Sequence, residues 1–264
     1  MSLRVTILGC GSSGGVPRIG PMWGQCDSTN PKNRRRRCSI LVEQRCKSGC
    51  TTVLVDTSPD LREQLLMVRA DHLDGVLYTH DHADHTHGID DLRMVAYAMK
   101  ARIPCYFDAA TRESLVTRFT YCFAQKEGSG YPPILTAQTI EPDVPVKISG
   151  GGGVLEVVAI PQVHGDIPSL GFRFGNIAYS PDISALPESS EPLLEGLDVW
   201  IVDSLRYTPH GSHFSVKQAV AHIERVKPKR AILTHMTTDL DYATLKRDLP
   251  PHVEPAFDGM VIEG

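Results

Sequence analysis

Residues 80–85 of this 264-residue chain read His80-Asp81-His82-Ala83-Asp84-His85, with three histidines and two aspartates in six positions. This stretch follows the apolar run 75–79, whose composition is typical of a buried strand. On the loop after such a strand, the first two histidines can point to one side while Asp84 and His85 turn to another. Imidazole and carboxylate ligands are then offered to two adjacent cations. A solvated loop that caps the next helix would explain Asp84, but not the three histidines around it.

Further short apolar runs stop abruptly at a polar residue. They are 52–56, 176–182, 199–203 and 231–235. Because these runs are apolar on both faces, they predict sheets covered by helices, with the polar residues at the strand ends gathered along one edge. Helices are expected at 59–68, 88–99, 110–119 and 215–226, the last of them capped by Ser215.

The stretch 80–85 reproduces in full the H-x-H-x-D-H motif of the metallo-β-lactamase fold superfamily, which the chain resembles along nearly its whole length. Three more residues of the family pattern appear in the required order, each at the end of a strand-like run: His164, Asp182 and His235. The resemblance implies an α/β fold, the four-layer αββα sandwich, formed by one domain over residues 1–264. A lid-like insertion is expected at about 120–153, where the pattern is least periodic.

The resemblance also implies a centre of two divalent metal ions, Zn²⁺ or Mn²⁺. It assigns His80, His82 and His164 to the first ion, Asp84, His85 and His235 to the second, and Asp182 to both as a bridge. Two divalent ions, two carboxylates and a bridging hydroxide leave a charge of about +1, which favours an anionic phosphodiester. A metal also lowers the pKa of a bound water to about 7, so that a hydroxide nucleophile forms at neutral pH.

Three further features resemble the phosphodiesterase branch of the superfamily. They are the opening 8–17 (Leu-Gly-Cys-Gly-Ser-Ser-Gly-Gly-Val-Pro), the run 34–39 (Arg-Arg-Arg-Arg-Cys-Ser), and Asp203-Ser204 followed by His213. This branch includes the phosphoribosyl cyclic phosphate phosphodiesterases and, more distantly, the tRNA 3′-processing endonucleases. In it a histidine upstream of the last ligand contacts the substrate phosphate and assists the leaving group, and His213 matches its place. His210 is a competing candidate, and His213 could instead cap the helix that follows.

Together these features predict a dinuclear metal-dependent hydrolase, a phosphodiesterase that cleaves a small nucleotide-like or cyclic phosphate diester with a metal-bridging hydroxide. Asp84 is expected to orient the hydroxide and His213 to assist the leaving alcohol. A thioester or lactone hydrolase on the same fold stays open as an alternative. So does a tRNA- or RNA-processing nuclease that holds RNA with arginines 34–37. These arginines could equally be a solvated entrance to the next strand, because alternate ones face opposite sides.

The composition argues against several other classes. The net charge of −4, from 27 basic and 31 acidic residues, gives no global field that would draw nucleic acid or an anionic membrane. No apolar run approaches the ~20 residues that cross a bilayer, and no secretory signal is visible, so we expect a cytoplasmic protein. Seven cysteines, an odd number, argue against a disulfide framework. A homodimer is suggested by the resemblance alone.

Three smaller features leave more than one interpretation. The stretch 9–14 (Gly-Cys-Gly-Ser-Ser-Gly) matches a dinucleotide-binding fingerprint. Pro17 and Pro21 prevent the helix that must follow, so a tight loop is favoured over a nicotinamide enzyme. The cyclic phosphate phosphodiesterases carry a zinc-binding cysteine cluster after Gly-Val-Pro, whereas this chain keeps only Cys26, so that structural zinc is not expected and the substrate stays open. Asp56 either orients a ligand imidazole or caps a loop.

Overall fold

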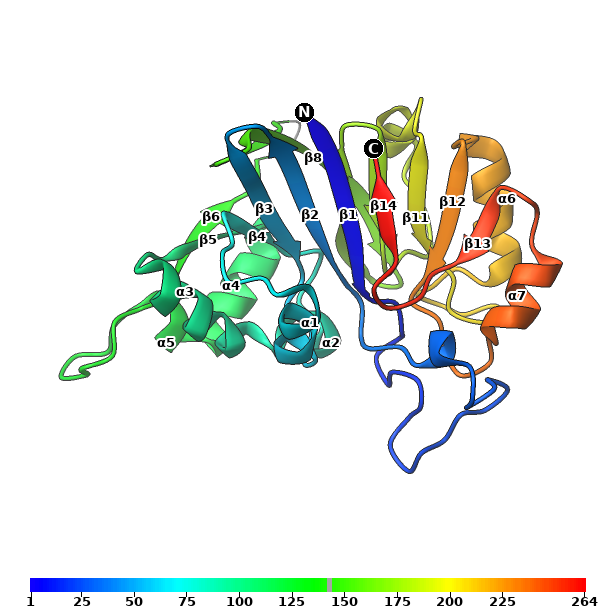
Figure 1. The fold of residues 1–264 in the computed structure, drawn as a ribbon, viewed down its shortest axis with the longest axis horizontal. Coiled ribbons are helices and arrows are strands. Elements are labelled where there is room, and N and C mark those ends of the chain that lie inside the picture. Colours follow the sequence, from blue (N-terminus) through cyan, green and yellow to red (C-terminus); the bar gives the residue numbers. More distant parts are fainter. Residues whose placement is uncertain (142–143) are drawn as a thin grey trace.

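Two mixed β-sheets lie face to face at the centre of the molecule (Figure 1), in a computed structural model that describes residues 1–141 and 144–264. The first sheet has the strand order β14-β1-β2-β3-β4-β5-β6, and the second has the order β13-β12-β11-β10-β9-β8-β7. The first sheet consists of β14 (Val261–Glu263), β1 (Ser2–Gly9), β2 (Ser39–Cys46), β3 (Gly49–Val55), β4 (Gly75–Leu77), β5 (Ile103–Phe107) and β6 (Leu135–Thr139). The second consists of β13 (Val253–Pro255), β12 (Arg230–Thr234), β11 (Val199–Asp203), β10 (Ile177–Ser180), β9 (Ile167–Phe174), β8 (Gly153–His164) and β7 (Val146–Gly150).

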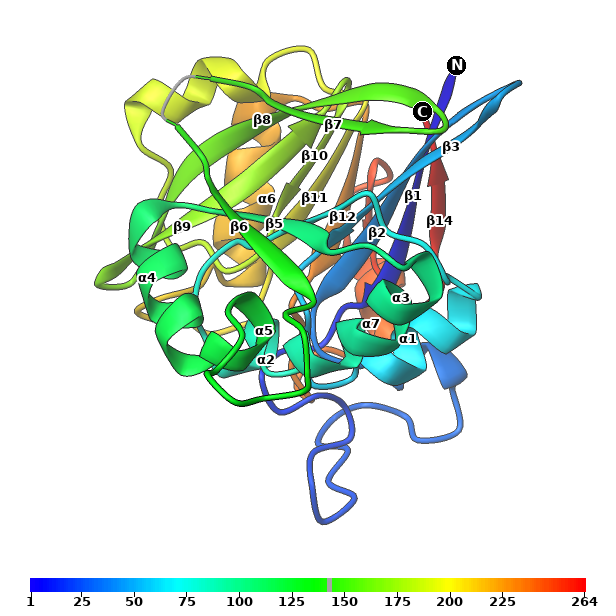
Figure 2. The same ribbon diagram turned by 90° about the vertical axis from the view of Figure 1, so that its left-hand side faces the viewer.

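Helices flank both sheets, and this confirms the αββα sandwich expected from the sequence. The helices α1 (Leu61–Val68), α3 (Leu92–Met99), α4 (Ala109–Arg118) and α5 (Thr120–Phe123) lie on the outer side of the first sheet (Figure 2), with the short α2 (Ala83–Thr86) at its edge. The helices α6 (Val216–Val226) and α7 (Tyr242–Asp248) lie beside the second sheet. The expected cap of α6 is present, because Ser215 Oγ accepts a hydrogen bond from the Gln218 amide within a capping box. None of the helices in the described ranges is long and apolar enough to span a membrane.

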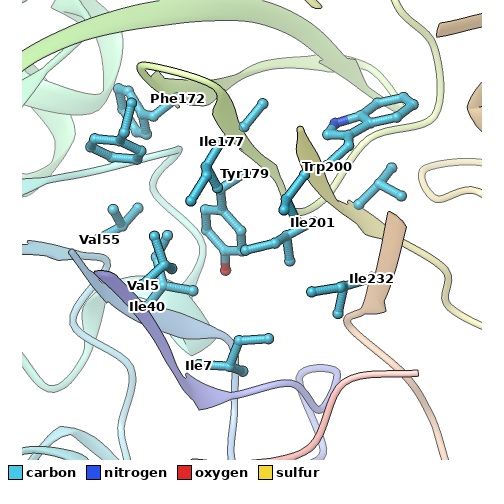
Figure 3. Close-up of a cluster of buried hydrophobic side chains, with 14 of the residues drawn as sticks. Val5, Ile7, Ile40, Val55, Phe172, Ile177, Tyr179, Trp200, Ile201 and Ile232 are labelled. Atoms are coloured by element: carbon cyan, nitrogen blue, oxygen red, sulfur yellow. The ribbon is translucent and has the colours of Figure 1, made fainter. Parts of the chain in front are cut away.

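Alternating side chains of the strands fill two apolar layers. In β2, Ile40 and Val42 point into the layer between the sheets, whereas Leu41 points into the layer beneath the helices. Figure 3 shows the layer between the sheets, where Tyr179 points from the second sheet toward Val5 and Ile40 of the first. Full burial of one such aliphatic side chain contributes about 1.5–3 kcal/mol. The packed layers therefore hold the ends of the strands in a fixed relation to one another.

One edge of the sandwich collects the strand ends that carry the predicted ligands. The strands β10, β11 and β12 run parallel to one another, as do β3 and β4. The chain leaves β4 toward the stretch 80–85, and His164 is the last residue of β8. Asp182 lies just after β10, and His235 follows β12 directly. The polar strand ends thus gather along one edge, as the sequence pattern predicts.

The glycine-rich stretch 9–14 is a tight loop packed against neighbouring backbone, the interpretation that the sequence favours. Gly11 forms short bridges with Arg37 and with Met236, so the loop connects the edge of the first sheet to the segment that follows β12. A Cβ atom at Gly9 would lie 2.0 Å from the carbonyl oxygen of Arg37, so only glycine fits there. The loop leads into an irregular segment rather than the helix of a dinucleotide-binding fold.

The segment 120–153 adds a strand to the edge of each sheet. Within it, α5 is followed by β6, which pairs in parallel with β5. β7 pairs antiparallel with β8. The described parts of this segment therefore belong to the sandwich itself. Residues 142–143 lie outside the described residues, and a role of the segment as a lid stays a prediction.

Two of the four arginines at 34–37 form ion pairs on the surface of the sandwich. Arg36 lies 3.5 Å from Asp258, and Arg37 lies 2.8 Å from Asp60. Arg34 is exposed. These partners favour the strand entrance over a phosphate-binding patch, because guanidiniums already held by carboxylates have fewer donors left for RNA.

The remaining arginine, Arg35, is buried and holds the segment that follows β12. Its guanidinium donates hydrogen bonds to the carbonyl oxygen of Leu240 at 2.7 Å and to that of Thr237 at 3.2 Å. These contacts join residues more than 200 positions apart in the sequence. Arg35 therefore fixes the loop that begins at His235.

The adjacent Arg34 and Arg35 give a matched pair of stability variants. Arg35→Ala should lower the free energy of unfolding by about 2–4 kcal/mol, because two buried carbonyl oxygens lose charged donors. Arg34→Ala should change it by less than about 0.5 kcal/mol. Urea unfolding in the presence of a chelator, followed by circular dichroism, measures both without a contribution from metal binding. Equal midpoints for the two variants would contradict the structural role of Arg35.

Candidate metal centre

The structure brings all seven predicted ligand residues together at the edge of the sandwich. They form two groups, and in each group the ligand atoms, one from each residue, lie within 4.8 Å of one another. The first group is His80, His82, His164 and Asp182, and the second is Asp84, His85, Asp182 and His235. Asp182 belongs to both groups, which is the arrangement expected of a residue that bridges two ions.

The two carboxylate oxygens of Asp182 face different groups. Oδ1 lies 3.0 Å from His85 Nε2 and 3.3 Å from His235 Nε2. Oδ2 lies 3.6 Å from His164 Nε2 and 3.8 Å from His80 Nε2. Asp182 is only 2% exposed, so water cannot readily satisfy these oxygens. One buried carboxylate therefore offers one oxygen to each group.

Asp84 and His82 complete the two groups from the more open side. Asp84 Oδ2 lies 3.5 Å from His85 Nε2 and 3.6 Å from His235 Nε2. The ring of His82 is exposed, and its Nδ1 lies 3.3 Å from His164 Nε2. Each group thus combines deeply buried ligands with one that solvent or substrate can reach.

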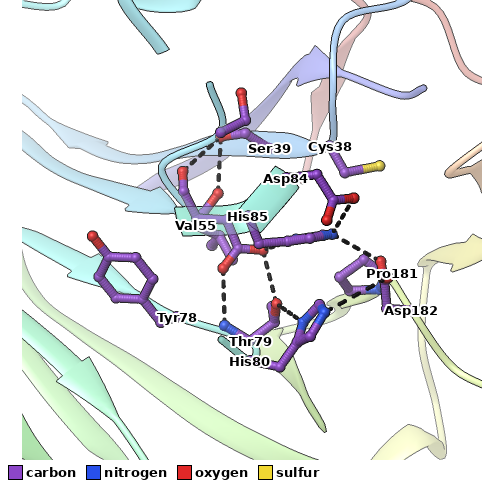
Figure 4. A network of polar contacts seen from close by, with 12 residues as sticks. Cys38, Ser39, Val55, Tyr78, Thr79, His80, Asp84, His85, Pro181 and Asp182 are labelled. Carbon is purple, nitrogen blue, oxygen red and sulfur yellow. Dashed lines mark hydrogen bonds and ion pairs between the residues drawn. The ribbon is translucent and has the colours of Figure 1, made fainter. Parts of the chain in front are cut away.

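Asp56, which follows β3, orients two of the histidines. Figure 4 shows these two, His80 and His85, with Thr79 and Asp182 beside them. His85 Nδ1 donates to Asp56 Oδ2 at 2.7 Å. Thr79 donates to the same carboxylate from its backbone amide at 2.9 Å and from its hydroxyl at 2.8 Å, and the hydroxyl oxygen accepts from His80 Nδ1 at 3.0 Å. Both imidazoles then carry a proton on Nδ1 and keep the Nε2 lone pair for the centre. These contacts favour the orienting role of Asp56 over that of a loop cap.

His164 is fixed in the same way by a backbone group. Its Nδ1 donates to the carbonyl oxygen of Ser212 at 2.7 Å, which leaves the Nε2 lone pair directed at Asp182 and His82. For His235 the nearest carboxylate to Nδ1 is Asp203, at 3.8 Å. For His80, His85 and His164, hydrogen bonds behind the ring therefore set the inward direction of Nε2.

Three residues of this edge adopt the left-handed backbone conformation, with φ of 63° at Asp56, 43° at Asp182 and 58° at His235. Aspartate and histidine tolerate this region better than most residues, yet such conformations are uncommon outside glycine. Each costs on the order of 1–3 kcal/mol and persists only where surrounding contacts determine it, as at functional sites.

The donor set fits divalent metal ions. Buried atoms without a hydrogen-bond partner among the described residues include His80 Nε2, His85 Nε2, His235 Nε2 and Asp182 Oδ1. Buried polar atoms normally have partners, because leaving one unsatisfied costs free energy. Imidazole and carboxylate ligands around a shared carboxylate are the set that ions such as zinc accept, so a pair of cations would satisfy all four atoms.

The pKa shifts of Asp182 and His235 also indicate that the centre needs positive charge. Burial alone would raise the pKa of Asp182, but His235, His85 and His80 outweigh burial and hold that pKa well below its usual range. Burial opposes charging of His235 as well, yet Asp182 and Asp84 raise its pKa to about 9. Asp182 is therefore ionised near neutral pH, and protons on histidines or bound cations must balance its charge.

His213 lies beside the two groups and is held by a carboxylate of its own. Its Nδ1 is 2.8 Å from Asp203 Oδ2, and its Nε2 is 4.0 Å from Asp182 Oδ2. His210 is exposed, with its ring centroid 5.3 Å from that of His213. Of the two candidates for assisting the leaving group, His213 is the one that faces the centre.

Three supporting residues were not assigned a role by the sequence: Thr79, Asp203 and Ser212. Asp203 ends a strand-like run, so its position at the edge was visible, but not its contact with His213. Thr79 and Ser212 act through a hydroxyl and a backbone carbonyl, and their residue types carry no specific signal.

Comparison with known proteins agrees with this geometry. The family model of the β-lactamase superfamily domain matches residues 51–236. The crystal structure of a diphosphatase from the PhnP family superposes with a TM-score of 0.87 at 33% sequence identity, covering 100% of this chain and 98% of that chain. This confirms the resemblance to the phosphodiesterase branch.

Two more distant structures share the fold. Zinc-bound PqqB from Methylobacterium extorquens has a TM-score of 0.75 at 17% identity, covering 98% of this chain and 99% of its own. The short form of human tRNase Z has a TM-score of 0.65 at 19% identity, covering 98% of both chains. At these identities the likeness concerns the architecture alone.

A curated protein of Porphyromonas gingivalis, named an octanoyltransferase, is 30% identical over 263 residues. The match covers 98% of this chain but 51% of that protein, so the chain spans about half the length of this relative. The match to the family model spans the motif 80–85 and all of the other predicted ligands. The chain therefore belongs to the β-lactamase superfamily and has the metallo-β-lactamase fold.

Proposed function

We propose that this protein is a metal-dependent hydrolase, a phosphodiesterase with a dinuclear metal centre that acts on a small nucleotide-like or cyclic phosphate diester. The observation that carries the proposal is the pair of His213 and Asp203 beside the shared carboxylate of Asp182. A carbonyl substrate does not need a second, non-ligand imidazole there. An anionic diester uses one, both to bind a phosphate oxygen and to protonate the alcohol that leaves.

The ligand groups would hold two divalent ions, the first with His80, His82 and His164, the second with Asp84, His85 and His235, and both with Asp182. Such ions supply positive charge for the phosphate oxygens and activate water for attack. Asp56, Thr79 and Ser212 hold the ligand rings in place during the reaction. Substrate binding then requires little rearrangement of the protein, which lowers the barrier to reaction.

Asp84 is suited to orient the attacking water. Nearby histidines, first among them His85, overcome the effect of burial and hold the pKa of Asp84 well below its usual range. The carboxylate is therefore ionised at neutral pH and can accept a hydrogen bond from water. It is also less buried than Asp182, with 13% of its side chain exposed, so that solvent can reach it.

His213 is suited to donate a proton to the leaving oxygen. Its hydrogen bond to Asp203 fixes the orientation of the ring. The remaining nitrogen, Nε2, points toward the centre, where the phosphate would bind.

The relative from the PhnP family is named a diphosphatase, and a phosphoric anhydride is therefore the second candidate substrate class.

Purified protein supplied with zinc or manganese should hydrolyse bis(p-nitrophenyl) phosphate, and a chelator should abolish the reaction, since the ions supply both charge and activated water. An acyl thioester should not be hydrolysed under the same conditions. Release of p-nitrophenolate and of free thiol measures the two reactions. Hydrolysis of the thioester without hydrolysis of the diester would place the enzyme in the carbonyl class instead.

The role of His213 as proton donor predicts a dependence on the leaving group. His213→Gln should lower kcat by about 100- to 10,000-fold on diphenyl phosphate, whose leaving phenolate needs a proton. The loss should be much smaller on bis(p-nitrophenyl) phosphate, because p-nitrophenolate leaves without one. Metal content should stay at the wild-type level. An equal loss on both substrates would show that His213 binds the phosphate without donating the proton.

Asp182 should be required to retain the metal ions. After dialysis, elemental analysis should find much less metal in Asp182→Asn than in the wild type, because both groups lose a charged oxygen. Asp166→Asn is the matched control, since Asp166 is an exposed aspartate only two residues after His164. Full metal content in Asp182→Asn would contradict the bridging assignment.

A further inference from the structure

A polar cavity beside the start of α7 has no role in the proposed reaction. Its volume is about 410 Å³, within the ~300–1,000 Å³ that is typical of sites for small molecules. Side chains from three parts of the chain surround this one space. They are Gln25, Tyr207, Thr208, Asp239, Asp241 and Thr244.

The cavity lies close to the metal centre, because two of its walls continue from neighbouring strand ends. Asp203 ends β11 and His235 follows β12, and these two strands pair in parallel. Tyr207 comes four residues after Asp203, and Asp239 comes four residues after His235. Four residues of chain reach at most about 14 Å. A substrate with its phosphate at the centre can therefore place an attached group in the cavity.

Hydrogen bonds fix the three segments around the cavity. The Gln25 amide donates to the carbonyl oxygen of Thr238 at 2.8 Å. The carbonyl oxygen of Leu205 accepts from both the amide and the hydroxyl of Thr237, at 3.0 and 2.9 Å. The Asp239 amide in turn donates to the Thr237 hydroxyl at 3.3 Å. The cavity is thus formed before a ligand enters, which lowers the cost of binding.

The cavity combines an available carboxylate with an aromatic ring. Asp241 caps α7, and its carboxylate already accepts from the Thr244 amide at 2.9 Å and from Asn33 Nδ2 at 2.6 Å. Asp239 is exposed, and no hydrogen bond or ion pair joins its carboxylate to any other described residue. The side chain of Tyr207 is 47% exposed. A ligand can therefore bond to Asp239 and stack on Tyr207.

The charge of the cavity favours a neutral ligand that is rich in hydrogen-bond donors. Its lining holds two carboxylates and neither lysine nor arginine, so a phosphate would be repelled. A carboxylate accepts two parallel hydrogen bonds from adjacent N–H groups. Guanine offers such a pair, N1–H and the 2-amino group, whereas adenine and cytosine have an acceptor nitrogen beside their amino group.

We propose that this cavity is a guanine-binding pocket, in which Asp239 accepts hydrogen bonds from N1–H and the 2-amino group while the base stacks on Tyr207. Gln25 and Thr208 carry side-chain donors for the guanine O6. The inference rests on the proposed function, since the phosphodiester of the same nucleotide would bind at the metal centre. It specifies the substrate class as a diester of a guanine nucleotide.

Two substrates that differ by one amino group test the pocket. Guanosine and inosine 5′-(p-nitrophenyl phosphate) contain the same reacting diester, but inosine lacks the 2-amino group. Release of p-nitrophenolate measures kcat/KM for each. The wild type should prefer the guanosine substrate by about tenfold, the scale of one hydrogen bond to a charged group. Asp239→Asn should reduce this ratio toward one, because its side chain has a single acceptor oxygen.

Further variants separate stacking and general effects from the contact with Asp239. Tyr207→Ala should lower kcat/KM by about tenfold for both substrates and keep their ratio, because stacking does not depend on the 2-amino group. Tyr207→Phe should retain the wild-type values. Asp71→Asn is the matched control, since Asp71 is an exposed aspartate before β4, at the opposite end of that strand from the stretch 80–85, and it should keep the wild-type ratio.

The outcomes distinguish the pocket from the proposed function. If the wild type cleaves both nucleotides with equal kcat/KM, or if Asp239→Asn keeps the preference, the guanine pocket is wrong while the phosphodiesterase stands. Unchanged rates in Tyr207→Ala would contradict the stacking contact. If the wild type loaded with zinc or manganese cleaves neither these substrates nor bis(p-nitrophenyl) phosphate, the proposed function and the pocket fall together.

Discussion

The buried carboxylate of Asp182 is shared by the two ligand groups, and this sharing limits how the two sheets can be placed. Its two oxygens face two groups of histidines, and these histidines come from strands of both sheets. His80 and His85 follow β4 of the first sheet, whereas His235 follows β12 of the second. A carboxylate can serve both groups only if the sheets keep a fixed separation. The apolar layer between the sheets provides that rigidity, and Arg35 holds the segment that carries His235.

Behind this carboxylate, two further aspartates set the direction of the rings. Asp56 directs His85 and, through Thr79, His80, whereas Asp203 directs His213. Both aspartates are fully buried and lie at strand ends, one in each sheet. The fold therefore repeats one device, in which a carboxylate at the end of a strand accepts the Nδ1 proton and leaves Nε2 for the centre.

The sequence predicts the parts of this arrangement that have a local pattern. The stretch 80–85 and the apolar runs that end at Asp182 and His235 were sufficient to predict the sandwich and the edge at which these residues meet. The contacts of Arg35 and Ser212 were beyond reach, since each links segments that only the folded chain brings together. The sequence predicts a surface position for all four arginines at 34–37. It does not reveal that Arg35 is buried, because a guanidinium held by two carbonyl groups has no signature in the sequence.

His85 and His213 make the same kind of hydrogen bond to a buried aspartate. We nevertheless propose different roles for them, because their Nε2 atoms have different surroundings. His85 and His213 each donate Nδ1–H to a buried aspartate, at 2.7 and 2.8 Å. His85 Nε2, however, faces both Asp182 at 3.0 Å and Asp84 at 3.5 Å, where a cation is favoured. Among the described residues, Asp182 is the one carboxylate within 4.0 Å of His213 Nε2, at 4.0 Å. His213 Nε2 lies outside the tighter carboxylate arrangement, which is consistent with the proposal that this nitrogen exchanges a proton with the substrate.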